Sequence, residues 1–246
     1  GSPLQMKLKL TAIGIIGAFA LSANAGDSKA VEEVIIVDDS IGATISAGYM
    51  TDYIFYGVDL GNNAVLTGVD YSLESLGVPL DVGVWYINPT DSSYDELDVY
   101  AGYSLPSFAG VDASLNFVAY FFPQTSADAT YELNLALSYD AGFVDVVGLV
   151  AYDFEIEGWY FMGGISKGFA ISDDLEIVLS ATIGGQNDYW ASSGFWNDVQ
   201  VKAALPIALT DNATLEPYIG GLFALDATED LQDDIVHGGV SLSVSF

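Results

Sequence analysis

The 246-residue sequence contains no cysteine and no arginine, and it has one histidine, His237. Without cysteine there is neither a disulfide framework nor a thiolate metal site, even if the chain is exported to an oxidising compartment. Five lysines stand against 34 acidic residues, which gives a formal net charge of −29 at pH 7. Recognition of a nucleic-acid backbone requires clustered Lys and Arg side chains, so nucleic acid is excluded as a partner.

The single imidazole also limits the chemistry that the chain can perform. A Ser-His-Asp triad must use His237 or not exist. The residue two positions further on is Gly239 rather than a serine, and strand alternation turns His237 away from the apolar face. We therefore expect no catalytic residues, no enzymatic activity and no cofactor.

Beyond residue 25 the chain lacks an apolar run long enough for a membrane-spanning helix. Nevertheless, hydrophobic residues make up 51% and aromatic residues 13% of the sequence. Disorder requires low hydrophobicity together with charge, so the acidity does not indicate a disordered chain. Alternating strands reconcile the two properties, because a transmembrane β-barrel carries its apolar residues on every second position.

The first 43 residues are predicted to precede the folded barrel. Lys7 and Lys9 are followed by a short apolar run and by Ala23-Asn24-Ala25, the small-x-small pattern of a signal-peptidase site. The alternative, a retained anchor, is disfavoured because the run is too short for a transmembrane helix. The expected divisions are a cloning remnant at 1–5, a signal peptide at 6–25, a periplasmic leader at 26–43 and the barrel at 44–246.

Period-two alternation with turn residues at its ends predicts twelve strands. Most are as long as a tilted strand needs to be to cross a bilayer, and longer than strands of soluble sheets. Two of them, 145–155 and 159–169, alternate poorly, which predicts a bulge or a misplaced boundary. The predicted strands are 44–60, 64–73, 80–88, 96–105, 112–122, 130–140, 145–155, 159–169, 175–186, 197–208, 213–225 and 235–246.

The last predicted strand keeps its alternation to the terminal Phe246. Chain ends usually fray, so a strand that is regular to its final residue needs a partner, which a closed barrel supplies. This ending resembles the C-terminal signature of bacterial outer-membrane β-barrels, and the resemblance implies that the barrel-assembly machinery recognises Phe246. We expect an all-β, 12-stranded antiparallel up-and-down transmembrane β-barrel, surrounded by lipid, in the outer membrane of a Gram-negative bacterium.

Connection lengths and aromatic residues orient this barrel. With both termini in the periplasm, the external links are 61–63, 89–95, 123–129, 156–158, 187–196 and 226–234, and they include the two longest. Trp and Tyr favour the membrane interfaces. The predicted external girdle comprises Trp85, Phe121, Phe122, Trp159, Trp190 and Trp196, and the periplasmic girdle comprises Tyr71, Tyr103, Tyr139, Phe169 and Phe246.

The inward face carries the candidate functional residues. Carboxylates cannot face lipid at low cost, and rings of acidic side chains attract cations. Small inward residues such as Gly48 and Gly184 favour an opening, whereas Tyr56, Trp85 and Tyr120 would narrow it. The predicted pore-lining residues are Asp52, Asp70, Glu96, Asp98, Glu132, Glu176, Lys202 and Glu216, and the same alternation sends Asp81 and Asp112 inward. These residues predict a slender pore that favours cations.

An acidic external loop follows the eleventh predicted strand. Its carboxylates make Asp230, Asp233 and Asp234 weak candidates for a Ca²⁺ or Mg²⁺ site, because hard cations take oxygen ligands. The spacing with a central glycine that an EF-hand requires is missing. We interpret the segment as a solvated loop without a metal.

The region 46–104 resembles the TorF-type porin family. The segments that carry the resemblance are Ser46-Ala-Gly-Tyr-Met-Thr-Asp-Tyr-Ile-Phe-Tyr-Gly57, Gly68-Val-Asp-Tyr71, Gly83-Val-Trp85 and Glu96-Leu-Asp-Val-Tyr-Ala-Gly-Tyr103. The family pattern has Arg where this chain has Tyr56. The resemblance implies a porin-like barrel, but anion preference does not carry over to this chain.

Three functions were weighed against these residues. A passive porin-like channel for small, preferentially cationic or neutral solutes requires an acidic, wet lumen. A non-conducting structural or adhesive barrel would have a lumen blocked by aromatic residues and would act through its acidic external loops. A lipid-active enzyme would need a histidine-centred triad, which the sequence does not contain. We expect the channel.

Overall fold

The computed structural model describes residues 41–172 and 175–246. The predicted cloning remnant, signal peptide and leader up to residue 40 lie outside the described residues. The only helical element in the described part is a short 3-10 turn, Glu74–Leu76. The strands are β1 Ala43–Phe55, β2 Val58–Ser72, β3 Leu80–Pro89, β4 Glu96–Phe108, β5 Val111–Phe121, β6 Thr130–Asp140, β7 Asp145–Asp153, β8 Gly158–Ser172, β9 Leu175–Asn187, β10 Trp196–Ala204, β11 Ile207–Thr210, β12 Ala213–Ala224 and β13 Ile235–Ser245.

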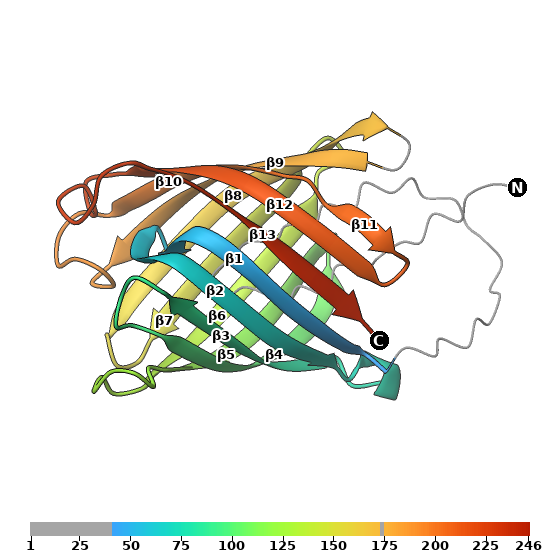
Figure 1. Cartoon of the computed structure of the whole chain (residues 1–246), viewed down its shortest axis with the longest axis horizontal. Coiled ribbons are helices and arrows are strands. Elements are labelled where there is room, and N and C mark those ends of the chain that lie inside the picture. Colours follow the sequence, from blue (N-terminus) through green and yellow to red (C-terminus); the bar gives the residue numbers. More distant parts are fainter. Residues whose placement is uncertain (1–40, 173–174) are drawn as a thin grey trace, which may run out of the picture.

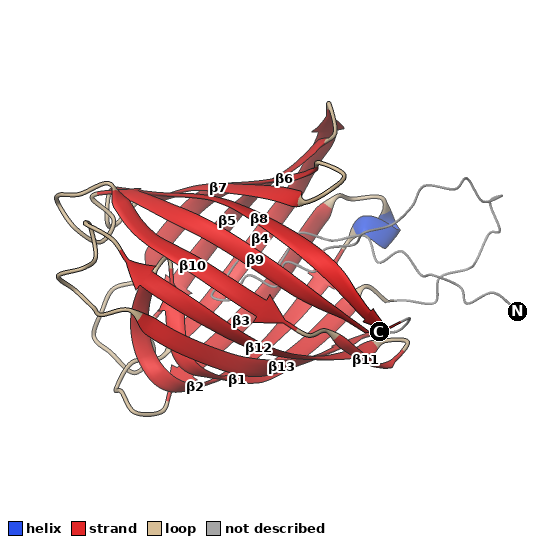
Figure 2. Cartoon of the chain, turned by 90° about the horizontal axis from the view of Figure 1, so that it is seen from above, coloured by secondary structure: helices blue, strands red, loops and turns tan. Residues whose placement is uncertain are grey.

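The strands form a closed 12-stranded antiparallel β-barrel, as predicted (Figures 1 and 2). Consecutive strands are neighbours, and β13 returns to pair with β1. β10 and β11 both pair with β12 and form two parts of one barrel strand. The interruption falls at Leu205 and Pro206, because proline has no N–H to donate to the ladder, while Leu205 N still bonds the Pro217 carbonyl at 3.0 Å.

The chain end closes the barrel. Phe246 N donates to the Ala43 carbonyl at 2.8 Å, and Gly42 N donates to the Phe246 carbonyl at 3.1 Å. The final residue therefore takes part in the ladder rather than fraying. We call this end of the barrel the terminal end and the opposite end, where the longer connections gather (Figure 1), the loop end.

The first predicted strand boundary is wrong. The chain turns at Tyr56 and Gly57, where Phe55 pairs with Val58, and the segment 61–63 lies inside β2 rather than in an external link. Both turn residues have positive φ, 45° and 75°, as a two-residue type I′ hairpin turn requires. An irregularity in β1 between Asp52 and Ile54 shifts the register just before this turn.

The two strands with weak alternation, β7 and β8, pair without interruption from Asp145–Ser166 to Asp153–Gly158. Of the two explanations offered by the sequence, the misplaced boundary applies. The turn between them occupies residues 154–157, so the predicted link 156–158 was placed about two residues too late.

The outer face of the barrel is apolar. Side chains such as Val65, Val69, Leu115, Leu133, Leu179 and Val240 are exposed at alternate positions, as expected for a lipid-facing surface. The terminal-end girdle agrees with the prediction, since Tyr71, Tyr103, Tyr139, Phe169 and Phe246 are all exposed. Within residues 41–172 and 175–246, no helix has the length and apolar character needed to cross a membrane.

The loop-end girdle is only partly as predicted. Phe121, Trp159 and Trp196 are exposed on the outer face. Trp85 instead points into the barrel, because it shares the inward face of β3 with Asp81, and it is buried. Phe122 and Trp190 lie in connections that fold inward, where both pack against buried residues.

Candidate functional site: the barrel lumen

The half of the lumen near the terminal end is lined by small and polar side chains. Glycine, serine and threonine dominate its inward positions, and most of them are partly accessible. These positions include Thr44, Ser46, Gly48, Ser104, Ser138, Ser180, Thr182, Ser241 and Ser243. We call this stretch of small and polar inward side chains the polar vestibule.

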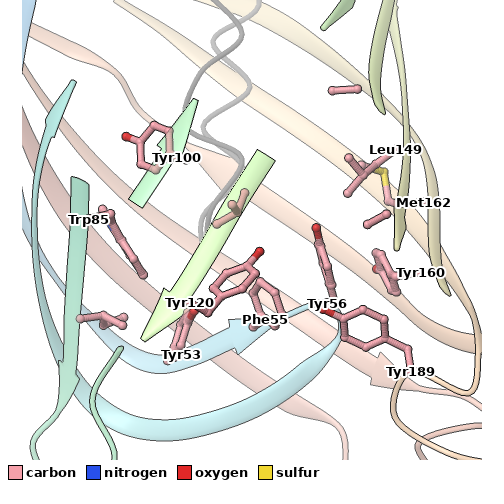
Figure 3. Close-up of a cluster of buried hydrophobic side chains, with 14 of the residues drawn as sticks. Tyr53, Phe55, Tyr56, Trp85, Tyr100, Tyr120, Leu149, Tyr160, Met162 and Tyr189 are labelled. Carbon is pink, nitrogen blue, oxygen red and sulfur yellow. The ribbon is translucent and has the colours of Figure 1, made fainter. Parts of the chain in front are cut away.

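The half near the loop end is filled by aromatic side chains (Figure 3). We call seven of the eight buried aromatic residues of this cluster, all except Tyr100, the aromatic plug; they are Tyr53, Phe55, Tyr56, Trp85, Tyr120, Tyr160 and Tyr189. They come from β1, β3, β5 and β8 and from the two connections that carry Tyr56 and Tyr189. A connected set of buried rings from different walls means that the plug extends across the lumen.

The tip of the β1–β2 hairpin supplies the centre of the plug. The Tyr56 ring stacks on the Tyr160 ring with centroids 4.2 Å apart, although β8 lies far from β1 in the strand order. The Phe55 ring meets Tyr120 of β5 edge-on at 5.6 Å, and the Tyr53 ring lies 5.8 Å from Trp85 of β3. The hairpin tip therefore folds inward and reaches three other walls of the barrel.

Backbone carbonyls of the tip are held by polar side chains of β10 and of two loop-end connections. Asn197 Nδ2 and Trp190 Nε1 donate to the Tyr56 carbonyl at 2.8 and 2.9 Å. Gln232 Nε2 donates to the Gly57 carbonyl at 2.6 Å. Three separate donors on one two-residue turn fix the inward position of the tip.

Gly57 allows this close approach. Its φ of 75° favours glycine, and a Cβ at this position would collide with the side chains of Asp198 and Asn197. The turn therefore packs directly against β10.

Two predicted pore-lining carboxylates lie within the plug and accept phenol hydrogen bonds. Glu96 accepts from Tyr53 at 2.5 Å and also from Tyr94. Glu132 accepts from Tyr56, Asn134 and Tyr189 at 2.8, 2.9 and 3.1 Å. Charge-assisted hydrogen bonds of this kind stabilise buried carboxylates.

The tyrosines outside the strands are held in their neutral form. Burial, followed by the charge of Glu132, raises the pKa of Tyr56 and Tyr189 well above the ordinary value. Burial, followed by the charge of Glu96, raises the pKa of Tyr94. These phenols therefore remain hydrogen-bond donors at neutral pH.

Asp98 differs from both glutamates. It is 0% exposed and receives no phenol hydrogen bond, and its carboxyl is a hydrogen-bonding neighbour of the Glu96 carboxyl on the same strand. Its inward position on β4 was predicted, whereas its pairing with Glu96 was not.

The other predicted lumen residues lie outside the plug. Asp70 accepts a hydrogen bond from Tyr100, and Asp52 accepts one from Asn62 at 2.8 Å. Glu176 is partly buried at the terminal end of β9, whereas Asp112 is exposed at the terminal end of β5. Whether these side chains line a conducting pore stays a prediction.

Lys202 has a defined environment in the lumen. Its Nζ lies 3.8 Å from a Glu216 carboxylate oxygen and 4.5 Å from the centre of the Tyr218 ring. The Tyr218 ring also meets His237, with centroids 5.9 Å apart. Neither ring nitrogen of His237 has a hydrogen-bond partner among the described residues.

The acidic loop between β12 and β13 does not assemble a metal site in the structure. Asp230 and Asp233 are exposed, and Asp234 accepts a hydrogen bond from Ala224 N at 3.1 Å. In the part of the chain that the structure describes, no group of three or more His, Asp or Glu side chains is placed to hold a metal ion.

Several important lumen residues were not among the predicted site residues. Tyr53, Tyr189 and Asn197 hold the plug together. The irregularity in β1 between Asp52 and Ile54 reverses the alternation of inward and outward side chains. A regular alternation along the whole strand therefore places Tyr53 on the wrong face. Tyr189 and Asn197 depend on how the 188–195 connection folds, for which sequence alternation carries no signal.

The family and structural comparisons agree with the geometry. Residues 38–199 match the profile of a family described as bacterial protein of unknown function (Gcw_chp). No curated protein matches the chain. The resemblance to TorF-type porins is not confirmed by these comparisons.

Several solved structures share the fold. The KdgM porin superposes with a TM-score of 0.58 at 11% identity, over 82% of this chain and 99% of its own. The NanC porin gives 0.52 at 16% identity, over 83% and 98%, and LpxR from Salmonella typhimurium gives 0.52 at 8% identity, over 82% and 100%. These likenesses show that the chain shares the closed-barrel fold of these proteins.

Proposed function

This chain belongs to the Gcw_chp family of bacterial proteins of unknown function, and we propose that it is an outer-membrane channel for small cationic and neutral solutes. In this proposal the loop end faces outward and the terminal end faces the periplasm. Solutes move through a narrow acidic lumen, and the aromatic plug closes that lumen in the state described above.

The charge balance of the inward face carries the proposal. Carboxylates project inward from β2, β3, β4, β6, β9 and β12, whereas Lys202 is the inward cation and is already paired with Glu216. A lumen with unbalanced negative charge concentrates cations and repels anions. The partly accessible vestibule supports a path for water and solutes up to the plug.

The identity of the solute is not transferred from the structural neighbours. One structure of KdgM holds oligogalacturonate, at 10% identity to this chain. Oligogalacturonate is a polyanion, and the inward carboxylates of this chain would repel it. The acidic lumen therefore favours solutes of the opposite charge.

Planar-bilayer recordings in a KCl gradient test the proposal. We expect a small conductance with a reversal potential on the K⁺ side. A matched pair of variants, Glu176→Gln in the vestibule and Glu155→Gln in the exposed 154–157 turn, removes one charge each. Only the first should reduce the preference for K⁺. A reversal potential on the Cl⁻ side would overturn the proposal.

A non-conducting structural or adhesive barrel is the second candidate. The observation that favours it is the plug itself, since Tyr53 and Tyr160 are 0% and 1% exposed and leave no opening beside them. This alternative would be established if no conductance were recorded in planar bilayers even after the hairpin tip is shortened.

We assign the chain no enzymatic activity. Neither ring nitrogen of His237 has a hydrogen-bond partner among the described residues, whereas the imidazole of a triad bonds both to the nucleophile and to a carboxylate. The proposed partners are outer-membrane lipid, the barrel-assembly machinery through Phe246, and small solutes or cations, without nucleic acid.

A further inference from the structure

The buried carboxyl groups near the loop end receive hydrogen bonds from neighbouring N–H or O–H groups, with one exception. Glu96 and Glu132 accept from phenols, and Asp198 accepts from two side-chain amides at 2.8 Å each. Asp98 accepts no hydrogen bond from a described phenol, amide or backbone N–H group. Its hydrogen-bonding neighbour is the Glu96 carboxyl, two residues away on β4. The bond between these two carboxyl groups therefore needs a donor of its own.

Two carboxyl groups bond to each other only when one of them holds a proton. An ionised carboxylate accepts hydrogen bonds but has no hydrogen to donate. Glu96 and Asp98 are 3% and 0% exposed on β4, and two carboxyl groups in one buried site cannot both ionise at low cost. The pair therefore shares one proton and carries one negative charge.

The contacts of Glu96 place this proton on Asp98. Glu96 Oε1 accepts from Tyr53 at 2.5 Å, and Glu96 Oε2 accepts from Tyr94. Both oxygens of Glu96 thus already act as acceptors, as in a carboxylate. Asp98 is then the neutral acid, and its O–H group donates to Glu96.

The surroundings of Asp98 offer no counter-ion for its ionised form. The titratable groups that face it are carboxyl and phenol groups, and no described lysine or histidine is among them. They are Glu96 and Tyr100 on β4, Glu132 on β6, Tyr53 on β1, Tyr120 on β5 and Tyr94 in the connection between β3 and β4. On β3 the cross-strand neighbour of Asp98 is Trp85, which does not titrate. An ionised Asp98 would therefore lie beside a second carboxylate, which is costly unless water reaches the pair.

The same pair is linked to the hairpin tip. The Tyr53 hydroxyl donates to Glu96, and the Tyr53 ring lies 5.8 Å from Trp85. These rings pack beside two carboxyl groups that are almost inaccessible in the structure. Water therefore reaches the pair when Tyr53 is displaced, so ionisation of Asp98 and displacement of Tyr53 favour each other.

We propose that Asp98 holds a proton in the closed plug and that loss of this proton displaces Tyr53 and widens the lumen, so that rising pH opens the channel. This assignment rests on the proposed channel function. The closed plug binds one proton that the widened form releases, so the ratio of widened to closed barrels rises by up to about tenfold per pH unit. The contacts of Tyr56 and Tyr189 with Glu132 lie outside this step, which precedes ionisation of the phenols.

Planar-bilayer recordings between about pH 4 and about pH 9, which separate the ordinary ranges of carboxyl and phenol groups, test the proposal. We expect the conductance of the wild-type barrel to rise several-fold with pH. Asp98→Asn keeps an N–H donor for Glu96 but cannot ionise, so it should hold the low conductance throughout. Asp112→Asn removes one carboxylate from an exposed position at the terminal end of β5 and should keep the rise. The same rise in wild type and in Asp98→Asn would overturn the proposal.

Infrared spectroscopy of the detergent-solubilised barrel detects the proton itself, because the C=O stretch of a carboxylic acid is separated from the bands of carboxylates. At about pH 6, where exposed carboxyl groups are ionised, we expect an acid band that Asp98→Asn lacks and Asp112→Asn retains. Heat-modifiable electrophoretic mobility shows whether each variant is folded. In the wild type alone, the band should disappear over the pH interval in which the conductance rises. A folded wild-type barrel without this band at about pH 6 would refute the assignment.

The outcome is distinguishable from failure of the channel proposal. A K⁺-selective conductance that Asp98→Asn leaves with an unchanged pH dependence would remove the proton switch and leave the channel. An acid band from Asp98 in a barrel that conducts at no pH would keep the protonated carboxyl and remove the channel.

Discussion

At the scale of single residues, phenols take the role that arginine has in many barrels. The chain has no arginine, and Tyr53, Tyr56, Tyr94 and Tyr189 donate to the carboxylates of the plug. A phenol satisfies the lone pairs of a carboxylate but leaves its charge in place, whereas arginine would neutralise it. The plug is therefore both hydrogen-bonded and electronegative.

Gly57 and Gly77 provide a matched pair for testing the fit of the hairpin tip. Their φ values are 75° and 78°, but a Cβ at Gly57 would collide with Asp198 and Asn197, whereas a Cβ at Gly77 would meet nothing within 4 Å. We expect Gly57→Ala to lower the free energy of unfolding by about 1–3 kcal/mol more than Gly77→Ala, because overpacking adds to the shared backbone strain.

Urea unfolding of the two variants in lipid vesicles measures this difference. Equal losses in the two variants would mean that the tip does not pack against β10 in the membrane. Gly57→Ala should also raise the conductance, since a displaced tip no longer fills the lumen.

Alkaline pH should loosen the plug through its tyrosines. The pKa values of Tyr56, Tyr94 and Tyr189 are raised from the ordinary value of 10.0. A raised pKa in the folded barrel means that the stabilising contribution is complete below pH 10 and is lost as the pH rises through the raised values. Stability should therefore fall, and conductance rise, above about pH 10.

Tyrosinate absorbance at 295 nm follows this titration directly. The exposed Tyr103 and Tyr139 should ionise before the plug opens, and the plug tyrosines only together with it. A single ionisation phase for all the tyrosines, with no change in conductance, would contradict this expectation.

At the scale of elements, the β1–β2 hairpin acts as an inward-folded closure of the barrel. Tyr56→Asn tests this role, because Asn-Gly is a favoured pair for a turn with positive φ at both positions. The variant keeps the hairpin but loses the Tyr56–Tyr160 stack and the hydrogen bond to Glu132. We expect the conductance to rise several-fold while the barrel stays folded.

The lipid-facing Tyr131, which stacks on Phe117 at 6.3 Å, supplies the control for this measurement. Tyr131→Asn should leave the conductance unchanged. If Tyr56→Asn also left it unchanged, the tip would not be the closure.

Strand alternation predicted the barrel well because lipid and lumen impose opposite polarity on successive residues. Nearly every strand lies within a few residues of its predicted bounds, and the chain closes through Phe246 as expected. The first hairpin was misplaced because Tyr56 is not a typical turn residue. The stretch 61–63 carries turn chemistry, and Asn63 does have a positive φ of 51°, yet it lies inside a strand.

The candidate site was predicted in composition but not in arrangement. Alternation sent Glu96, Asp98 and Glu132 inward, and all three side chains are buried in the structure. Their environment depends on the folding of the hairpin tip and of the 188–195 connection across the barrel. Those contacts join residues such as Tyr56 and Glu132 that lie far apart in the chain. A local sequence pattern does not predict contacts of this kind.

At the scale of the whole molecule, a polar vestibule is joined to an aromatic plug. In the proposed channel, the vestibule sets which charge approaches, and the plug sets which solute passes. This division explains how an acidic barrel can keep a small conductance. The field of the carboxylates acts at a distance, whereas wider opening requires displacement of the hairpin tip.

The long-range part of this selectivity should depend on salt. The Debye length falls from about 10 Å at 0.1 M salt to about 3 Å at 1 M, so carboxylates on the lumen wall act on the axis of the lumen only in dilute salt. We expect the preference for K⁺ over Cl⁻, measured from the reversal potential, to decline several-fold across that range. A K⁺ preference that is independent of salt would place selectivity in the plug alone and would remove the vestibule from the mechanism.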